Sequence, residues 1–296
     1  MKKAFLQLHT AVFLAGFTAI LGKLIGLSEG LLVWYRMLIA VVTLLLIQQY
    51  RKGIQQLPAT ETLRLLAVGG VIAIHWVAFY GSLKYGNISI AVVCISGSGF
   101  FTAFFDPLIS RKALQWQEVV LGALAIAGIY IIFDFHPQYK TGILFGIVSA
   151  IGSSLFPIFN KQLVSRHNAG TLTLYEMAGG LLLLTILIPI YHRFFPPTQL
   201  LPTLTDWWWL LVLALVCTVY CFYLQLNALR HISPFTANLA YNLEPVYGIL
   251  LAFVIFKENK DFNRHFYLGV ALILLSVALQ TSRVWLKNRY RKAGAG

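Results

Sequence analysis

Charged residues lie inside long apolar stretches of this sequence, where ionised side chains are rare. Arg36, Glu176 and Glu244 are each flanked by apolar residues, and Lys161 sits less deeply in such a stretch. Inside a bilayer a charge costs about 3 kcal/mol or more, so each needs a partner or water. Arg36 has the chemistry to hold a solute carboxylate, and Glu176 or Glu244 to carry a proton. The alternative is a structural anchor to a helix end or a backbone carbonyl.

The stretch before Glu244 holds the richest polar stripe in the chain. Asn238, Tyr241 and Glu244 recur three residues apart, so a helix would place them on one face. Pro245 removes a backbone hydrogen bond and predicts a kink beside the carboxylate. We expect this stripe to face a solute cavity, with polar contacts between helices as the alternative.

Aromatic side chains with polar atoms occur in two other apolar stretches. His75, Trp76 and Tyr80 group on one side at helical spacing, and Tyr220 and Asn227 occupy a later stretch. Such side chains suit a small amphipathic metabolite, although an aromatic stripe also serves packing.

Small residues and a proline complete the predicted cavity. Ser96 and Ser98 alternate with glycines, and such small side chains allow a neighbouring helix to approach closely or leave space for a ligand. Pro157 predicts a helix kink near Asn160. The full set of candidate cavity residues is His75, Trp76, Tyr80, Ser96, Ser98, Asn160, Tyr220, Asn227, Asn238, Tyr241 and Glu244.

Patterns of metal, cofactor and hydrolytic chemistry are missing from the sequence. The three cysteines, Cys94, Cys217 and Cys221, fall in apolar runs, and no His or Cys set completes a zinc site. A nucleotide-binding Gly-x4-Gly-Lys-Ser/Thr loop and a His-Glu-x-x-His motif are also absent, and Ser98 does not lie in a Gly-x-Ser-x-Gly elbow, because position 96 is Ser. We expect no metal, no cofactor and no catalytic residue.

The composition indicates a membrane protein. Hydrophobic residues make up 58% of the 296 residues and charged residues 11%. The net charge of +13 comes from basic residues in short segments between apolar runs and near the C-terminus, which is typical of membrane anchoring rather than nucleic-acid binding. We expect a small-molecule substrate and the lipid bilayer as partners.

Ten apolar segments predict an all-α polytopic protein with ten transmembrane helices. They cover residues 4–25, 30–50, 64–83, 88–110, 117–134, 142–163, 172–191, 207–227, 235–256 and 267–286. The first segment reads as a retained helix rather than a signal peptide. Fifteen Lys and Arg fall on the side of the N-terminus against seven on the other, so we expect both termini in the cytoplasm and the protein in the cell membrane.

The two halves of the chain repeat each other. Lys23 matches Lys161, and Tyr35-Arg36-Met37 matches Tyr175-Glu176-Met177. Five helices per copy place the copies in opposite orientations, as two inverted five-helix repeats over 1–136 and 137–286, followed by a basic cytoplasmic tail at 287–296. Arg36 and Glu176 then lie about 9 Å into helices that enter from opposite sides of the membrane, which disfavours a direct ion pair without excluding one.

Several short motifs occur in a fixed order in the two copies of the repeat. The first copy has Ala-Gly-Phe-Thr-Ala-Ile-Leu-Gly-Lys at 15–23 and Ser-Leu-Lys-Tyr-Gly-Asn at 82–87, and the second has Asn160-Lys161, Ala-Leu-Arg-His-Ile-Ser-Pro at 228–234 and Leu-Glu-Pro-Val at 243–246. In these features the chain resembles the EamA-like branch of the drug/metabolite transporter superfamily. The first copy departs from the pattern, with Ser98-Gly99 in place of Glu244-Pro245 and Arg111-Lys112 in place of Glu258.

The resemblance implies a secondary transporter for a small metabolite. Members of the family move amino acids, sugars and other metabolites, and the expected mechanism is alternating access at a central site between the repeats. We expect a polar or amphipathic solute, amino-acid-like or otherwise, and export as the direction. A non-transporting scaffold or receptor and an intramembrane enzyme are the alternatives.

Overall fold

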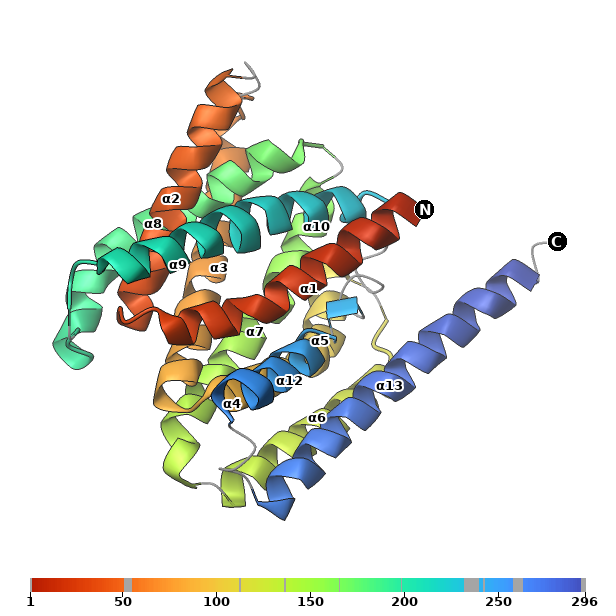
Figure 1. The fold of residues 1–296 in the computed structure, drawn as a ribbon. Helices are drawn as coiled ribbons and strands as arrows, with labels where there is room; N and C mark the ends of the chain where they lie inside the picture. The colour runs from red at the N-terminus through yellow and green to blue at the C-terminus, as the bar shows by residue number, and fades with distance from the viewer. Residues whose placement is uncertain are drawn as a thin grey trace.

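The computed structural model of this chain is built from helices, and the described residues contain no strand (Figure 1). The structure describes residues 2–50, 55–111, 113–135, 137–164, 166–197, 199–231, 240–241, 243–257 and 263–293. The α-helices are α1 (Lys2–Leu24), α2 (Glu29–Tyr50), α3 (Ala59–Tyr85), α4 (Ile88–Ile95), α5 (Ser98–Ser110), α6 (Trp116–Phe135), α7 (Lys140–Leu163), α8 (Ala169–Phe194), α9 (Leu204–Ala214), α10 (Cys221–Leu229), α12 (Glu244–Phe256) and α13 (Arg264–Ala293). Two short elements join them, the 3-10 turn η1 (Pro137–Tyr139) and the π-helical turn η2 (Leu215–Tyr220).

Membrane-length helices dominate the described part of the chain. Seven segments there are long and apolar enough to cross a membrane, namely Lys3–Leu24, Glu29–Tyr50, Ala59–Tyr85, Ile88–Ser110, Lys140–Lys161, Ala169–Phe194 and Leu204–Leu229. The other three expected spans correspond to shorter apolar helices, Trp116–Gly128, Tyr247–Phe256 and Arg264–Ser276. The all-helical membrane class is therefore confirmed, and the count of ten spans stays a prediction.

Polar residues mark where several helices begin. The side chain of Asn87 accepts from the Ile90 amide at 2.8 Å to cap α4, and Asn168 accepts from Thr171 at 2.7 Å to cap α8. Thr203 and Asp206 form a reciprocal capping box at the start of α9. These caps satisfy amides that a helix leaves without partners at its first turn.

Two expected spans contain an irregular turn. The fourth, predicted over 88–110, corresponds to the membrane-length segment Ile88–Ser110, in which a turn at Ser96 and Gly97 separates α4 from α5. The eighth passes through η2, where the Thr218 hydroxyl donates to the Leu213 carbonyl five residues earlier at 2.8 Å. A π-turn inserts an extra residue into the helical ladder and changes which side chains face each way downstream.

The predicted basic tail begins within the last helix. Residues 287–293 are the end of α13, and 294–296 lie outside the described residues, so the assignment of 287–296 as a cytoplasmic tail stays a prediction. Figure 1 shows α13 extending beyond the rest of the molecule at this end.

Corresponding helices of the two halves pack against each other in antiparallel pairs. In the α2–α8 pair, Gly30 lies beside Tyr191 at one end, and Gln48 donates to the Gly170 carbonyl at 2.8 Å at the other. In the α6–α13 pair, Arg283 donates to Gln115 at 2.9 Å, and Gly128 packs on Gly269 farther along. In both pairs, residue numbers rise along one helix as they fall along the other.

The loop between α1 and α2 is tied down at one end of the molecule by both halves of the chain. Lys84, at the end of α3, donates to the carbonyls of Ile25 and Leu27 in this loop. Asp206, in the first turn of α9, accepts from the Gly26 amide at 2.7 Å.

The opposite end repeats this arrangement around the loop between α7 and α8. Arg230, just after α10, donates to the His167 carbonyl at 2.8 Å. Glu61, in the first turn of α3, contacts His167 at 2.8 Å and Arg166 at 3.5 Å. Lys84 matches Arg230 in the repeated motifs, and Glu61 and Asp206 both lie in the first turn of the third helix of their half.

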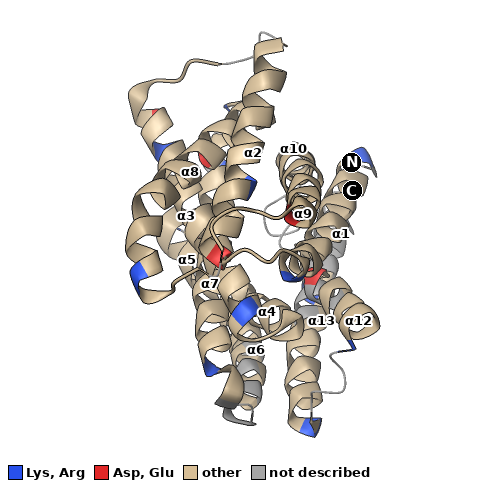
Figure 2. Cartoon of the chain, turned by 60° about the vertical axis from the view of Figure 1, so that its left-hand side comes forward, with Lys and Arg blue, Asp and Glu red and all other residues tan. Residues whose placement is uncertain are grey.

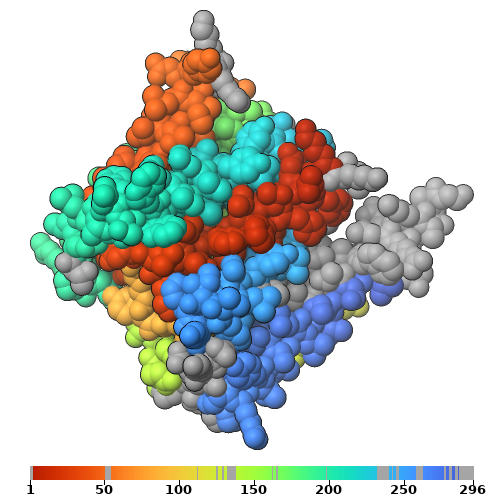
Figure 3. All heavy atoms as spheres, viewed as in Figure 1, coloured from red at the N-terminus to blue at the C-terminus, as the bar shows by residue number. Residues whose placement is uncertain are grey.

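The surface carries the signs of a lipid environment. Figure 2 shows the charged residues concentrated towards helix ends and loops, with long uncharged stretches between them. Large apolar side chains such as Leu6, Leu46 and Leu108 are exposed. In Figure 3 the N-terminal helix α1 forms a surface band between the teal α9–α10 segment and the blue α12 segment. Contiguous exposed apolar surface of this kind suits a bilayer rather than water.

Candidate functional site

A cavity of about 80 Å³ lies among helices from both halves of the chain. It is lined by Ala15, Thr18, Arg36, His75, Trp76, Phe79, Ile95, Ser153, Phe156, Cys217, Cys221, Phe222, Gln225, Tyr241 and Glu244. Complete ligand sites usually measure about 300–1,000 Å³, so this cavity would hold only a small polar group or a few waters as it stands.

Arg36 on α2 is the cationic centre of the cavity. Its Nε donates to the Thr218 hydroxyl at 2.6 Å, and its two terminal nitrogens donate to the Tyr80 hydroxyl at 3.0 Å and the Cys217 carbonyl at 3.2 Å. The guanidinium carbon lies 3.6 Å from the ring centroid of Trp76, a cation–π contact. These bonds use three of the five guanidinium N–H groups, and the described residues provide no bond to the other two.

The π-turn η2 supplies two of the partners of Arg36. The Cys217 carbonyl accepts from the guanidinium, and the Thr218 hydroxyl accepts from Arg36 while donating to the Leu213 carbonyl. A carbonyl has two lone pairs, so it can accept from Arg36 as well as from an amide of its own helix. Arg36, from the first half of the chain, is thus fixed by a local distortion in the second half.

His75 lies on the α3 wall and is held from α7. Its Nδ1 is 2.8 Å from the Ser149 carbonyl and 2.9 Å from the Ser149 hydroxyl. A carbonyl only accepts, so this bond requires the proton on Nδ1 and leaves Nε2 of the neutral ring as an acceptor. Gly152 permits this contact, because a Cβ there would lie 2.8 Å from the Cβ of His75.

Glu244 provides the carboxyl group of the same cavity. It stands in the first turn of α12, with Tyr241 one turn before it, and both line the cavity with Arg36. Pro245 occupies the first turn of α12, where a missing amide costs no hydrogen bond, rather than a helix interior. Pro157, by contrast, lies inside α7, as a kink-forming proline would.

Glu176, the repeat counterpart of Arg36, lies away from the cavity lining. It is fully buried in α8, where α3 approaches so closely that a Cβ at Gly69 would overlap the Glu176 carbonyl. Asn160 on α7 faces the carboxyl group, but neither carboxyl oxygen meets hydrogen-bond geometry with a described residue. The ion pairs found among the described residues are Arg166–Glu61, His167–Glu61 and Arg283–Glu118 and involve neither Arg36 nor Glu176.

The structure brings part of the predicted cavity set together. His75, Trp76, Tyr241 and Glu244 line one cavity, and Arg36, singled out as a charge within an apolar stretch, lines it with them. Asn238 lies outside the described residues, as does Glu258.

The other predicted residues lie elsewhere. Tyr80 is buried behind Arg36, and Asn160 faces Glu176. The Ser96 hydroxyl donates to its own helix at Val92, and Ser98 begins α5. Tyr220 is exposed, and Asn227 donates to the Tyr223 carbonyl at 2.7 Å.

Several lining residues were not among the predicted set. The eighth span contributes Cys217, Cys221, Phe222 and Gln225 instead of Tyr220 and Asn227. The π-turn, which no residue pattern marks, sets this face, and apolar cysteines give no polar signal. Thr18 lies five residues before Lys23 in the quoted repeat motif, which is the one feature that singles it out.

Comparison with known proteins identifies a family along nearly the whole chain. The model of the EamA-like transporter family matches residues 2–134 and again 140–282. The uncharacterized transporter YetK of Bacillus subtilis is 26% identical over 92% of this chain and 84% of its own length. An uncharacterized transporter of Archaeoglobus fulgidus is 24% identical over 85% of this chain and 87% of its own length.

A solved structure shares the fold. One crystal structure of a protein superimposes with a TM-score of 0.65 over 95% of this chain and 97% of the other, at 19% identity. This similarity extends over both halves of the chain and shows the overall architecture alone.

Proposed function

The chain belongs to the EamA-like transporter family, and from this premise we propose that it is a secondary carrier for a small polar or amphipathic metabolite, working by alternating access. It is a membrane transporter by family and by its membrane-length helices. The observation that carries the finer proposal is a single cavity holding Arg36 from one half of the chain and Glu244 from the other.

The lining chemistry favours an amphipathic solute with an anionic group. Arg36 would hold the anion through its two remaining N–H groups, and Glu244 would receive a cationic or donor group. Trp76, Phe156 and Phe222 supply aromatic walls for an apolar side chain. An amino-acid-like solute fits all three features.

The small volume of the central cavity supports a carrier that changes conformation rather than an open pore. A cavity of about 80 Å³ must expand to admit a metabolite, so the helices around it must separate. Transporters built from inverted repeats achieve this by rocking one repeat against the other around a central site.

Two inverted five-helix repeats are the architecture we propose for this movement. The family model matches twice in succession, and corresponding helices meet in antiparallel pairs, α2 with α8 and α6 with α13. Helices related by an axis in the membrane plane run in opposite directions, whereas a parallel repeat would give parallel pairs. Ten spans with both termini in the cytoplasm and export across the cell membrane follow from the same proposal.

Contacts that hold one loop at each end of the molecule could control access to the cavity in such a carrier. Asp206 and Lys84 hold the α1–α2 loop, and Glu61 and Arg230 hold the α7–α8 loop. Each tie through a carboxylate joins the two halves, so release at one end would open the cavity to that side. We propose that these are the two gates of the transport cycle.

Proton coupling would use Glu244 in the cavity, with Glu176 as a second buried acid outside it. The test is uptake of labelled amino acids and other metabolites into proteoliposomes, with and without an imposed proton gradient. Saturable uptake enhanced by the gradient, and insensitive to it in Glu244→Gln, would support coupling through Glu244. Accumulation unchanged in both Glu244→Gln and Glu176→Gln would remove the coupling role, and the absence of uptake for every solute would shift the assignment to a scaffold or receptor.

A further inference from the structure

A second and larger hollow lies between α3 and α7, near the place where Glu61 contacts the α7–α8 loop. Its volume is about 480 Å³, and the described residues that line it include none of those that line the central cavity. The lining comprises Arg64, Ala67, Val68, Val71, Phe159, Leu163 and Arg166. We call this hollow the α3–α7 groove.

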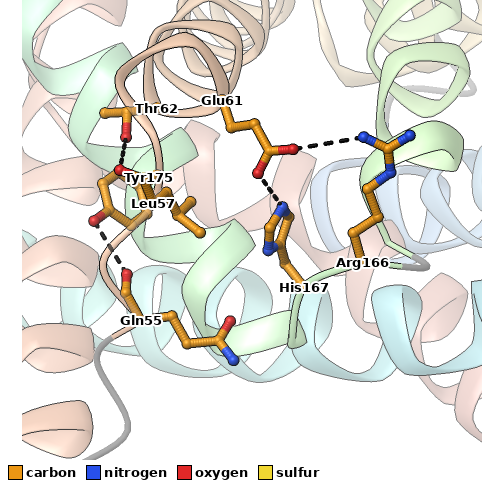
Figure 4. A network of polar contacts seen from close by, with 7 residues as sticks. All are labelled: Gln55, Leu57, Glu61, Thr62, Arg166, His167 and Tyr175. Carbon is orange, nitrogen blue, oxygen red and sulfur yellow. Dashed lines mark hydrogen bonds and ion pairs between the residues drawn. The ribbon is translucent and has the colours of Figure 1, made fainter.

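Basic side chains gather at one end of the groove. Arg64 is exposed on α3, and the side chain of Arg166, just after α7, is 65% exposed. Glu61 is shared between Arg166 at 3.5 Å and His167 at 2.8 Å, as Figure 4 shows, so it neutralises Arg166 only in part. Arg230 adds a third guanidinium through its bond to the His167 carbonyl. This end therefore carries a net positive charge even with a neutral His167.

The remaining walls are apolar and run along the helix axes. Residues 64, 67, 68 and 71 recur at helical spacing, so they form one stripe on α3, opposite Phe159 and Leu163 of α7. From Arg64 to Val71 this stripe descends by about 10 Å, at a rise of 1.5 Å per residue. Arg64 lies only five residues after the start of α3, which places the charged end near the membrane interface and the apolar walls deeper.

We propose that the α3–α7 groove binds an anionic phospholipid. The phosphate would lie between Arg64 and Arg166, whose planar guanidinium groups match phosphate oxygens in pairs, and an acyl chain would cover Val68, Val71 and Phe159. A free phosphate would leave the apolar walls uncovered, and a zwitterionic lipid would bring its own cation towards the arginines. Basic pockets between membrane helices on the cytoplasmic side bind anionic headgroups in this manner, and the charge count assigns this end to the cytoplasm.

Native mass spectrometry of the full-length protein in neutral detergent tests the proposal without a transport assay. The probes are phosphatidylglycerol and phosphatidylcholine with identical acyl chains. We expect phosphatidylglycerol to be retained at least tenfold more strongly, and Arg64→Gln with Arg166→Gln to abolish the preference. Arg193→Gln, an exposed change outside the groove, is the matched control and should keep it.

Two further arms separate a lipid site from a charge effect. Ala67→Trp leaves all the arginines in place but fills the groove, so it should lower retention of phosphatidylglycerol as the arginine variants do. Inorganic phosphate alone should neither bind measurably nor displace the lipid. Equal retention of both lipids, an unchanged preference in the double arginine variant or in Ala67→Trp, or displacement by inorganic phosphate would each overturn the proposal. Because these changes are at the groove and not in the cavity, the result is independent of whether the transport proposal holds.

Discussion

Arg36 donates from Nε to the hydroxyl of Thr218 at 2.6 Å, and this bond joins the two halves of the chain beside the central cavity. The Thr218 hydroxyl, in the π-turn, donates in turn to the Leu213 carbonyl at the end of α9. A positive charge is therefore held in place by neutral acceptors and the Trp76 ring, so it keeps its charge for a solute. The proposed carrier mechanism depends on this arrangement.

Replacement of Arg36 should reduce transport strongly. Arg36→Gln removes the charge that would bind the solute anion, and charge-assisted hydrogen bonds contribute about 1.5–3 kcal/mol each, so kcat/KM should fall by about tenfold or more. Arg36→Lys keeps the charge but loses the planar fork and should retain an intermediate rate. Uptake into proteoliposomes measures both, with Arg193→Gln as the exposed control. Wild-type rates in Arg36→Gln would show that solute does not bind there.

Thr218→Val should have a smaller effect in the same assay. It preserves the shape of the side chain but leaves Arg36 Nε without its acceptor, a loss of about 1–3 kcal/mol for a buried donor. We expect weaker solute binding with the protein still folded, measured as a raised KM at nearly unchanged protein yield. An unchanged KM would mean that the Thr218 bond does not position the guanidinium.

The sequence predicted the helical class and singled out polar residues near α2, α3 and α12. The length of an apolar segment, and a polar or charged residue within it, can both be read from that segment alone. Arg36, His75, Trp76, Tyr241 and Glu244 do share a cavity. Tyr220 and Asn227 are not among the described residues that line this cavity, so their contact with a solute stays a prediction, and the π-turn at Leu215–Tyr220 changes which side chains of this span face the cavity. The groove between α3 and α7 depends on how two helices separate, which no single segment encodes.

Cys217 and Cys221 line the central cavity, so their thiols should be accessible to a reagent that enters it. Both should react with a small thiol reagent in the folded protein, and solute should protect them. Cys94 is the internal control, because it packs against Gly146 outside the cavity and should stay unreactive. Labelling of single-cysteine variants by mass shift is the readout, and preferential labelling of Cys94 would contradict the assigned lining.

Loss of the Asp206 contact and loss of the Glu61 contact should each expose Cys217 in the cavity, but from opposite sides of the molecule. Asp206→Ala removes the acceptor of the Gly26 amide and should increase labelling of Cys217 from the side of the α1–α2 loop. Glu61→Ala should increase it from the other side, where it contacts His167. An impermeant reagent applied to vesicles of known orientation distinguishes the two.

Glu118→Gln is the control for this pair, because it weakens the contact with Arg283 at 3.7 Å between α6 and α13, away from both loops. It should leave labelling from both sides unchanged. If the Asp206 and Glu61 variants opened the same side, the proposed gates would be incorrect.

Close packing of α3 on α8 predicts a stability difference between neighbouring glycines. Gly69→Ala would force a methyl group into the Glu176 carbonyl and should destabilise the protein by about 1–3 kcal/mol, as overpacked cores do. Gly70→Ala meets only a flexible Leu183 methyl at 3.2 Å and should be nearly neutral. Thermal unfolding in detergent compares the two, and equal midpoints would argue against this helix contact.

Solute exchange across proteoliposomes tests alternating access most directly. Labelled solute would be offered outside vesicles loaded with unlabelled solute, for the wild type and for Arg36→Gln. The carrier proposal predicts saturable influx that is accelerated by solute on the far side, and loss of that acceleration in Arg36→Gln. Influx that rises linearly with concentration and ignores the solute inside would contradict a carrier and indicate a pore.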